Sequence, residues 1–282
     1  MRRLILLSII ASLVFACKKQ ETTSSSTQGG GTPSFTGSCS VGRWPAARRP
    51  ISLKISSDLT NDMAPALYVG GLSPLEQMAK VWNDSISGNI FFNVPFTAAA
   101  NTGYTDLDSY QDGQMGIYRS DQWYSEVSSG ALAITQYYGY LRTSSTLGSY
   151  VELTEADIII NNRNFNGDFT YEPISYSQDG IYKWDLPTVI LHEMGHFLGM
   201  CHDSGHSSVM KPYYGKTRKT LYSFDITKIT DLYVNNVNTL AGYSNLNAVT
   251  AADGTFVRGR TELMKNGECI HYINGKEVYR HK

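Results

Sequence analysis

Three histidines in one short segment have the type and the spacing of metal ligands. If the segment is helical, His192 and His196 are about 6 Å apart along the axis, so both imidazoles project from one face and reach one ion at about 2.0–2.1 Å. Gly199 can adopt a positive φ just beyond the helix, which would bring His202 to the same ion. Three nitrogen ligands leave one tetrahedral position of Zn²⁺ to water, which is typical of a catalytic zinc site.

A carboxylate stands beside that open position. Glu193 follows the first histidine directly, and as a general base it would take a proton from the water that zinc activates and pass it later to a leaving amine. The whole pattern, HExxHxxGxxH, should arise by chance in roughly one such sequence in 10⁵, so it is far more specific than HExxH alone. The segment therefore predicts a hydrolytic zinc site.

The segment resembles the zinc signature of the metzincin metallopeptidases, which is followed downstream by a turn that contains methionine. Ser208 to Tyr213 is similar to this Met turn, and Met210 follows the third histidine by a spacing similar to that of the matrixin branch. Asp203 departs from that branch, in which Ser is usual, and looks more like the adamalysin type. We give the spacing and the Met-x-Pro-x-Tyr pattern more weight than one residue.

The resemblance implies an α+β fold with a mixed twisted sheet over roughly residues 41–240. Residues 155–160 resemble the edge strand of such domains, 185–189 the start of the active-site helix, and 223–233 the C-terminal helix after the Met turn. The edge strand would hold an extended peptide by backbone hydrogen bonds. The pocket for the residue after the cut would be walled by Pro212, Tyr213 and Tyr214.

The activity implied by the resemblance is that of a zinc-dependent endopeptidase with a protein or peptide substrate. His192, His196 and His202 would be the ligands, Glu193 the general base and Met210 a structural residue below the site. The competing hypothesis is a membrane-tethered binding or adhesion lipoprotein that keeps zinc in an inactive scaffold, against which the intact glutamate argues.

Several other residues are weaker candidates. His206 follows the third ligand, but loop histidines are usually solvated, and His271 and His281 have no partners at ligand spacing. Tyr213 or Tyr214 as oxyanion donor is less favoured than the pocket wall. Relatives in the matrixin branch bind structural Ca²⁺, for which Asp157 and Asp168 are candidates without a recognisable ligand loop.

The elements that must position the zinc site precede it. Ile51, Leu53 and Ile55 alternate with polar residues, which predicts a strand over 51–56. Ser73-Pro74-Leu75-Glu76 predicts a helix start, with a Ser cap, Pro at the first position and Glu at the third. Further strands are expected at 90–96, 115–119, 131–141 and 155–161.

Length and composition agree with a globular enzyme. The 282 residues allow one large domain or about two smaller ones. Hydrophobic residues make up 41% and charged residues 17%, and 24 Lys+Arg against 25 Asp+Glu give a net charge of −1. This balance argues against a nucleic-acid partner.

The N-terminus predicts an exported bacterial lipoprotein. Arg2 and Arg3 precede a twelve-residue apolar stretch that is too short to span a bilayer, which indicates a signal peptide over residues 1–16. Val14-Phe15-Ala16-Cys17 resembles a lipobox, so we expect Cys17 to be lipidated and to anchor the chain in a membrane. Residues 17–40 would then be a flexible tether on the periplasmic side of the outer membrane or on the cell surface.

The last residues, 241–282, predict a small β-meander tail. Asn266-Gly267 and Asn274-Gly275 separate apolar-alternating segments at 261–265, 268–273 and 276–280. Three short strands hold little core, so a structural cap on the peptidase is favoured over an independent module.

The cysteines leave the pairing open. With Cys17 lipidated, Cys39, Cys201 and Cys269 remain, and we prefer a Cys39–Cys269 bridge because Cys201 adjoins a zinc ligand. The alternative, a Cys39 thiolate on zinc as a latency device, lacks the matching motif.

Overall fold

The computed structural model describes residues 41–99, 104–171, 183–212, 214, 217–237, 253–265 and 268–281. The predicted signal peptide, the tether with Cys17 and Cys39, and Tyr213 lie outside these residues, so what we expect of them stays a prediction. Within the described ranges, no helix is both long enough and apolar enough to cross a membrane.

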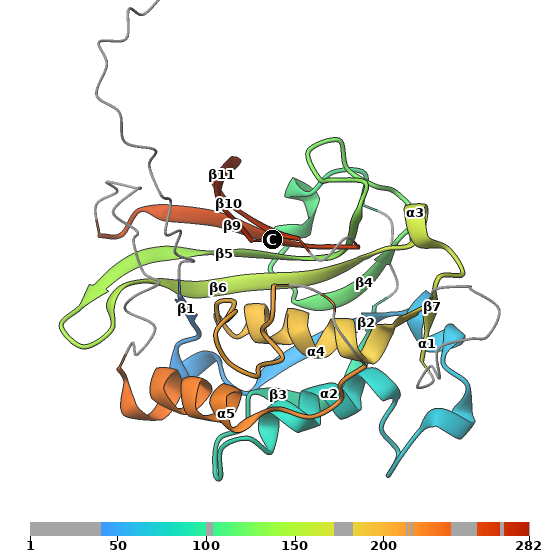
Figure 1. The fold of residues 1–282 in the computed structure, drawn as a ribbon, viewed down its shortest axis with the longest axis horizontal. Coiled ribbons are helices and arrows are strands. Elements are labelled where there is room, and N and C mark those ends of the chain that lie inside the picture. Colours follow the sequence, from blue (N-terminus) through green and yellow to red (C-terminus); the bar gives the residue numbers. More distant parts are fainter. Residues whose placement is uncertain are drawn as a thin grey trace, which may run out of the picture. The chain divides into compact units, whose positions relative to one another are not determined.

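One mixed sheet contains nine strands in the described part of the chain (Figure 1). Their order is β11, β10, β9, β5, β6, β4, β2, β3, and β1 pairs with β6. The pairs among β2, β3, β4 and β6 are parallel, whereas the pairs from β6 through β5 and β9 to β11 are antiparallel. The bounds are β1 Gly42–Arg43, β2 Ile51–Ser56, β3 Phe92–Ala99, β4 Gly116–Ser120, β5 Ala131–Ser144, β6 Gly148–Asn161, β9 Phe256–Met264, β10 Cys269–Ile273 and β11 Lys276–His281.

The prediction that residues 155–160 form the edge strand is wrong. They belong to β6, which lies between β5 and β4 inside the sheet. Ile158 and Ile160 face the main core, and Ile159 packs in a second cluster on the other face. An apolar run without alternation is typical of a strand buried on both faces, so this run indicated an interior position. The antiparallel strand beside it, β5, is the one that passes over the active-site helix.

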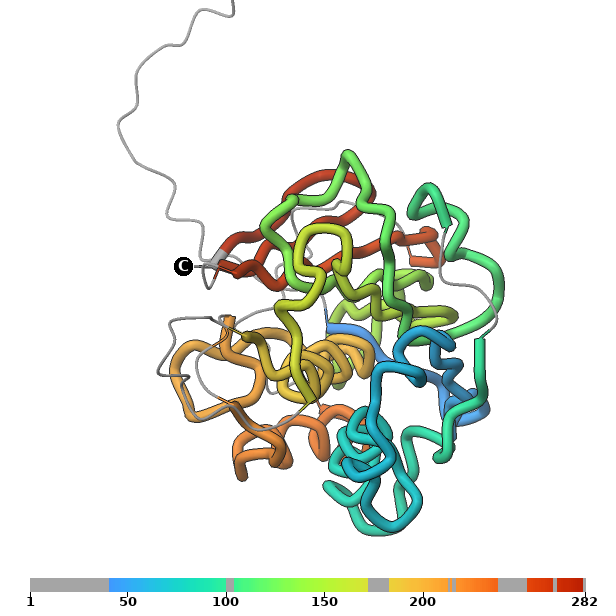
Figure 2. Tube along the Cα trace, turned by 90° about the vertical axis from the view of Figure 1, so that its right-hand side faces the viewer, coloured from blue at the N-terminus to red at the C-terminus, as the bar shows by residue number. Residues whose placement is uncertain are grey.

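Five α-helices lie in the described residues, and two of them build the site. α4 contacts β5 and β6, and α2 packs against α4. Figure 2 shows the same arrangement from the side. The bounds are α1 Ser57–Asp62, α2 Pro74–Asn83, α3 Asn162–Phe165, α4 Leu186–Phe197 and α5 Ser223–Thr230; β7 (Phe169–Thr170) and β8 (Trp184–Asp185) form a separate small sheet.

The predicted helix start at Ser73 is confirmed. The Ser73 hydroxyl accepts a hydrogen bond from the Glu76 N–H, and the Glu76 carboxylate accepts one from the Ser73 N–H at 2.7 Å. Glu76 also accepts from the Phe96 N–H at 2.7 Å, so the capping box ties α2 to β3. Trp82, buried on the inner face of α2, donates its indole N–H to the Leu191 carbonyl at 3.0 Å. The cap therefore sets the direction of a helix that supports α4.

The three predicted C-terminal strands are present, and they continue the main sheet. β9 pairs with the free side of β5, from Ala131 opposite Met264 to Tyr140 opposite Phe256. β10 and β11 follow as an antiparallel hairpin. Because β9 borders β5, the last segment of the chain lies beside the strand that passes over α4.

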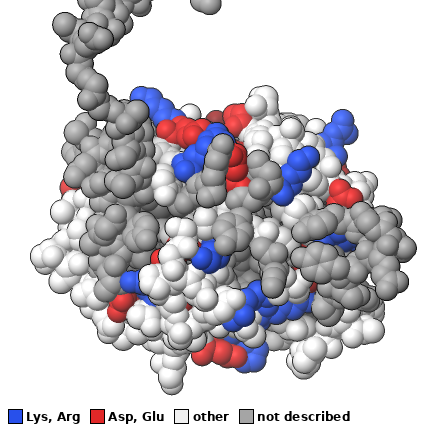
Figure 3. Space-filling view, viewed as in Figure 1, with Lys and Arg blue, Asp and Glu red and all other residues white. Residues whose placement is uncertain are grey.

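Charged side chains of both signs are interspersed on the face shown in Figure 3. This distribution matches the near balance of 24 basic and 25 acidic residues in the whole chain.

Candidate active site

The active-site helix α4 begins and ends at defined residues. The Asp185 carboxylate accepts a hydrogen bond from the Thr188 N–H at 2.9 Å and caps the first turn, where Pro187 has no N–H to satisfy. The helix ends at Phe197, and Gly199 then adopts a φ of 86°, as predicted. A Cβ on Gly199 would lie 1.9 Å from the Gly42 carbonyl oxygen, so both the turn and the close approach of β1 require glycine.

The three predicted ligands come together. The Nε2 atoms of His192, His196 and His202 lie 2.8 to 3.1 Å from one another, and all three side chains are buried. His192 Nδ1 lies 2.8 Å from the Val209 carbonyl oxygen, and His196 Nδ1 lies 2.9 Å from the Met200 carbonyl oxygen. A carbonyl only accepts, so these two Nδ1 atoms carry the proton and the Nε2 lone pairs point at each other.

That arrangement fits a bound cation. Unprotonated Nε2 lone pairs this close repel one another unless a positive charge lies between them, and a Zn²⁺ about 2.0–2.1 Å from each nitrogen would supply it. Burial lowers the pKa of His192 to about 4, although its hydrogen bond to Val209 opposes the shift, so the imidazole stays neutral and able to bind a metal. The backbone partners fix the ring orientations in the way that outer partners fix zinc ligands elsewhere.

Glu193 lies in the same buried space, where its side chain is fully excluded from solvent. Its Oε2 accepts a hydrogen bond from the Thr135 hydroxyl of β5, whereas Oε1 has no hydrogen-bond partner among the described residues. Burial raises the pKa of Glu193 to about 8, with the Thr135 hydrogen bond opposing the shift. A buried carboxylate oxygen left without a partner is costly, so Oε1 marks where a water or a substrate proton would belong.

Met210 lies against α4, and it explains Gly195. A Cβ on Gly195 would lie 2.2 Å from the Met210 sulfur and 3.2 Å from the Trp82 ring. The Met210 side chain therefore occupies the space beside Gly195. The Met210 carbonyl also accepts from the Asp203 N–H at 2.8 Å, which links the turn to the third ligand.

A buried carboxylate that the sequence analysis missed holds the Met turn. Asp225, on α5, accepts hydrogen bonds from the Ser208 hydroxyl, from the Val209 N–H at 3.0 Å and from the Tyr222 N–H at 2.9 Å. Burial raises the pKa of Asp225, and these hydrogen bonds oppose the shift. Since the Val209 carbonyl orients His192, Asp225 positions that ligand through the turn.

Asp203 and His206 form a local pair outside the histidine cluster. The buried Asp203 carboxylate accepts from the His206 N–H at 2.6 Å and lies 3.0 Å from the His206 ring nitrogen. The His206 side chain is 60% exposed and stacks on Phe224 with 4.1 Å between ring centroids. Asp203, the residue that departs from the matrixin pattern, therefore shapes the loop after the third ligand.

A cavity of about 410 Å³ adjoins the site. Tyr214 lines it as predicted, together with His192 and Val209, whereas Pro212 is not among the lining residues and Tyr213 lies outside the described part of the chain. The Tyr214 hydroxyl accepts from the Asp185 N–H at 3.0 Å, so it holds the start of α4, which agrees with a pocket wall better than with an oxyanion donor. Further lining residues are Thr188, Tyr222 and Leu263.

Two residues of β10, Cys269 and His271, reach the site without having been predicted there. His271 Nε2 lies 2.8 Å from His202 Nδ1, and the ligand atoms of His202, Cys269 and His271 lie within 4.8 Å of one another. If His202 binds a metal through Nε2, its Nδ1 carries the proton and donates a hydrogen bond to His271 Nε2. On the predicted strand, Cys269, His271 and Ile273 alternate with other residues and so share one face. The sequence did not show that this face points toward the zinc motif.

The preferred Cys39–Cys269 disulfide is wrong. Cys269 is a buried free thiol, and Cys201 is disulfide-bonded to a partner outside the described residues. Burial and then the nearby Glu193 raise the pKa of the Cys269 thiol well above its usual range. Cys269 lies on β10, beside the histidine cluster.

The described residues do not support a structural Ca²⁺ site at Asp157 or Asp168. Among the described residues, the groups of side chains close enough to share a metal are His192, His196 and His202, and His202, Cys269 and His271; neither contains a carboxylate. Asp157 is fully buried inside the sheet, where it accepts from the Gly116 N–H at 2.9 Å, and burial raises its pKa well above its usual range.

The comparisons with known proteins agree with this site. Residues 104–234 match the matrixin family of peptidases. Karilysin of Tannerella forsythia is 40% identical over 70 residues, which are 25% of this chain and 14% of Karilysin, so the match spans a small part of that relative. Together with the fold and the histidine cluster, these matches support a matrixin-like metallopeptidase with an α+β, metzincin-like fold.

Proposed function

We propose that this protein is a zinc-dependent endopeptidase that hydrolyses peptide bonds of extended protein substrates. The observation that carries the proposal is the convergence of the His192, His196 and His202 Nε2 atoms next to the buried carboxylate of Glu193. A site of three nitrogen donors with an adjacent base is open to a reactant, whereas a structural zinc site is closed by a fourth protein ligand.

Zinc, when bound, would polarise the peptide carbonyl and make water acidic enough to lose a proton near neutral pH. Glu193 would take that proton on Oε1, the oxygen without a partner, and carry it to the leaving nitrogen. Thr135 would keep Oε2 in place during both transfers through its hydroxyl. The positive charge of the metal would lower the pKa of Glu193 from its metal-free value of about 8 and so keep the base ionised.

The cavity beside His192 would receive the substrate side chain that follows the cleaved bond. It lies between α4 and the chain after the Met turn, with Tyr214 and Val209 in its wall. The roles of Pro212 and Tyr213 in this pocket remain part of the proposal. The substrate backbone would pair with the strand over α4 on the side of β5 that faces away from β6, which β9 occupies in the folded chain.

For the location we propose export and a lipid anchor. Arg2, Arg3, the apolar stretch and Cys17 support a lipoprotein signal, and a tether over residues 17–40 would hold the peptidase near a membrane, on the periplasmic side of the outer membrane or on the cell surface.

The test compares wild type with Glu193→Gln on a peptide library, each with and without a chelator. We expect chelator-sensitive cleavage in wild type, and in the variant a loss of about 1,000-fold or more with zinc retained. Glu126→Gln, at an exposed glutamate, is the matched control and should cleave like wild type. Equal, measurable cleavage by wild type and Glu193→Gln would refute the mechanism. Bound zinc without cleavage, both in wild type and in variants in which the C-terminal strands are released from β5, would favour the inactive-scaffold alternative.

A further inference from the structure

The edge of β5 over the site is occupied by the protein's own C-terminal strand. β9 runs antiparallel to β5 and pairs with it from Ala131 to Tyr140. A peptide that adds to this edge must use the N–H and C=O groups that β9 uses. Thr135, whose hydroxyl holds Glu193, is opposite Thr261 of β9, so the overlap falls at the reacting groups.

The side chains of β9 take up the space of a substrate as well as its backbone position. Leu263 is almost fully buried and lines the 410 Å³ cavity together with His192. Thr261, two residues earlier on the same face, donates to the Thr135 carbonyl at 3.5 Å. Leu263 therefore forms part of the cavity wall beside His192, where a peptide paired with β5 would have to pass.

β10, the strand next to β9 in the sheet, also covers the site. His271 is opposite Thr261, and Cys269 is opposite Leu263. Both side chains are buried, and His271 contacts the ring of His202 at 2.8 Å. A peptide cannot reach the three histidines along β5 while these two strands are in place.

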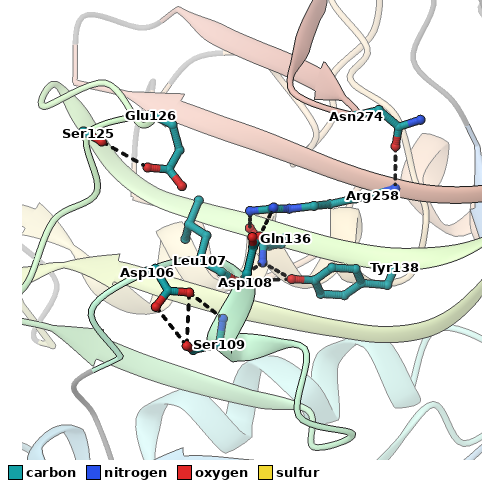
Figure 4. A network of polar contacts seen from close by, with 10 residues as sticks. All are labelled: Asp106, Leu107, Asp108, Ser109, Ser125, Glu126, Gln136, Tyr138, Arg258 and Asn274. Carbon is teal, nitrogen blue, oxygen red and sulfur yellow. Dashed lines mark hydrogen bonds and ion pairs between the residues drawn. The ribbon is translucent and has the colours of Figure 1, made fainter.

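The anchors of β9 lie on the opposite face of the sheet, away from the histidines. Arg260 and Glu262 form a buried ion pair at 2.9 Å, Arg260 donates to the Glu126 carbonyl at 2.7 Å, and Glu262 accepts from the Ser128 N–H at 3.2 Å. Figure 4 shows the second anchor, in which Arg258 contacts Asp108 and Gln136. The first anchor holds β9 to the loop before β5, and the second holds it to Asp108 and to Gln136 of β5; neither touches the histidine cluster.

The block β9 to β11 is at the end of the sheet, and among the strands of the described residues it pairs with β5 alone. It can therefore separate from β5 without breaking any other strand pair within the described residues. The Arg258–Asp108 anchor is weak, because the Asp108 side chain is 76% exposed and its charge is screened by water. Val257, Leu263 and Ile273 of this block are buried in the main core, so its release must expose them, but its place at the end of the sheet makes that release a local opening.

We propose that β9 and β10 are an internal competitor for the substrate: the folded chain is latent, and an extended peptide is cleaved only when this segment leaves the edge of β5. The inference rests on the proposed peptidase activity. It assigns residues 256–273 a regulatory role at the same site, with Leu263 in the substrate pocket and His271 against the third ligand.

The test uses the zinc-loaded full-length chain with a reversible lock. Gln136 and Arg260 are opposed in the β5–β9 register on the face away from the histidines. In the double variant Gln136→Cys, Arg260→Cys, an oxidised bridge should hold β9 on β5, whereas reduction leaves β9 without its Arg260 anchor and without the contact between Arg258 and Gln136. Reduction should raise the peptide cleavage rate and the amide hydrogen exchange of residues 256–264 together, each by about 10–100-fold.

Arg260→Ala is the second variant, because it leaves Glu262 buried without its partner and should release β9 in the same way. Arg119→Ala removes an ion pair between β4 and α1 that does not touch β9, and it should change neither readout by more than about twofold. Wild type with the same reductant controls for the Cys201 disulfide.

The outcomes separate the two proposals. Equal cleavage rates in the oxidised and reduced double variant, with exchange showing that β9 was released, would overturn the competitor role while leaving the peptidase intact. Slower cleavage in the reduced form would do the same and make β9 part of the active structure. Released β9 with zinc bound and no cleavage in any form would overturn the peptidase proposal itself.

Discussion

The histidine motif and the C-terminal strands meet at one point but are built in opposite ways. His192, His196 and His202 lie within one helix and the turn after it, and their convergence depends on helical spacing and one glycine. His271 comes from 69 residues further along the chain and reaches His202 only because β9 pairs with β5. The chemistry of this protein is thus local in the chain, whereas access to that chemistry depends on distant pairing.

The largest effect on zinc binding and cleavage should come from removing a histidine of the motif itself. His196→Ala removes a central zinc ligand, and we expect zinc affinity to fall by about 1,000-fold and cleavage to be lost. Competition with a chromophoric chelator measures the affinity. His206→Ala is the matched control, because its ring is exposed and outside the cluster; a similar loss there would show that the wrong histidines were assigned.

The burial of Glu193 between α4 and β5 gives a pH test on the zinc-free protein. The folded-state pKa of about 8 lies above the ordinary value of 4.5, so the folded state holds a proton that the unfolded state has lost. The free energy of unfolding should therefore fall as pH rises from about 4.5 to about 8, by up to about 5 kcal/mol relative to Glu193→Gln. Chemical denaturation at several pH values measures this difference.

The same pH titration can show whether the histidine motif or the C-terminal strands bury Glu193. In Arg260→Ala, with β9 released, water reaches Glu193 and the pH dependence should become smaller. An unchanged pH dependence in that variant would mean that the motif alone buries the carboxylate, without the C-terminal strands.

His271→Ala tests whether the C-terminal strands support zinc binding. His271 orients a ligand without being one, and loss of such a partner should weaken zinc binding by about tenfold. Tyr279→Ala, on the neighbouring strand β11, is the control that disturbs the same hairpin without removing the contact to His202. If both variants bind zinc equally well, the 2.8 Å contact does not support the ligand.

The smallest effect concerns the packing of the motif on Met210. Gly195→Ala should lower the free energy of unfolding by about 1–2 kcal/mol, because the new methyl group meets the Met210 sulfur and this outweighs the better helix propensity of alanine. Gly205→Ala, in an exposed loop where a Cβ has room, should change stability by less than about 0.5 kcal/mol. A stabilised Gly195→Ala would show that the turn can move away from the helix.

The sequence predicted the site better than it predicted the sheet around it. The spacing of the histidines, the positive φ at Gly199 and the capping box at Ser73 depend on neighbours within a few residues, and the structure has all three. The edge strand, the role of Asp225 and the partner of His202 depend on which strands and helices lie side by side. Asp225, for example, has no local feature that marks it as the holder of the Met turn.

Helical periodicity and glycine chemistry in the amino-acid sequence were enough to determine which side chains could bind a metal, because backbone geometry places residues one turn apart on one face. Strand order decided what those side chains meet, since a strand can pair with any edge of suitable length and polarity. Only the folded sheet shows that β9 pairs with β5, that Cys269 is a free thiol beside the histidines, and that Leu263 lines the pocket.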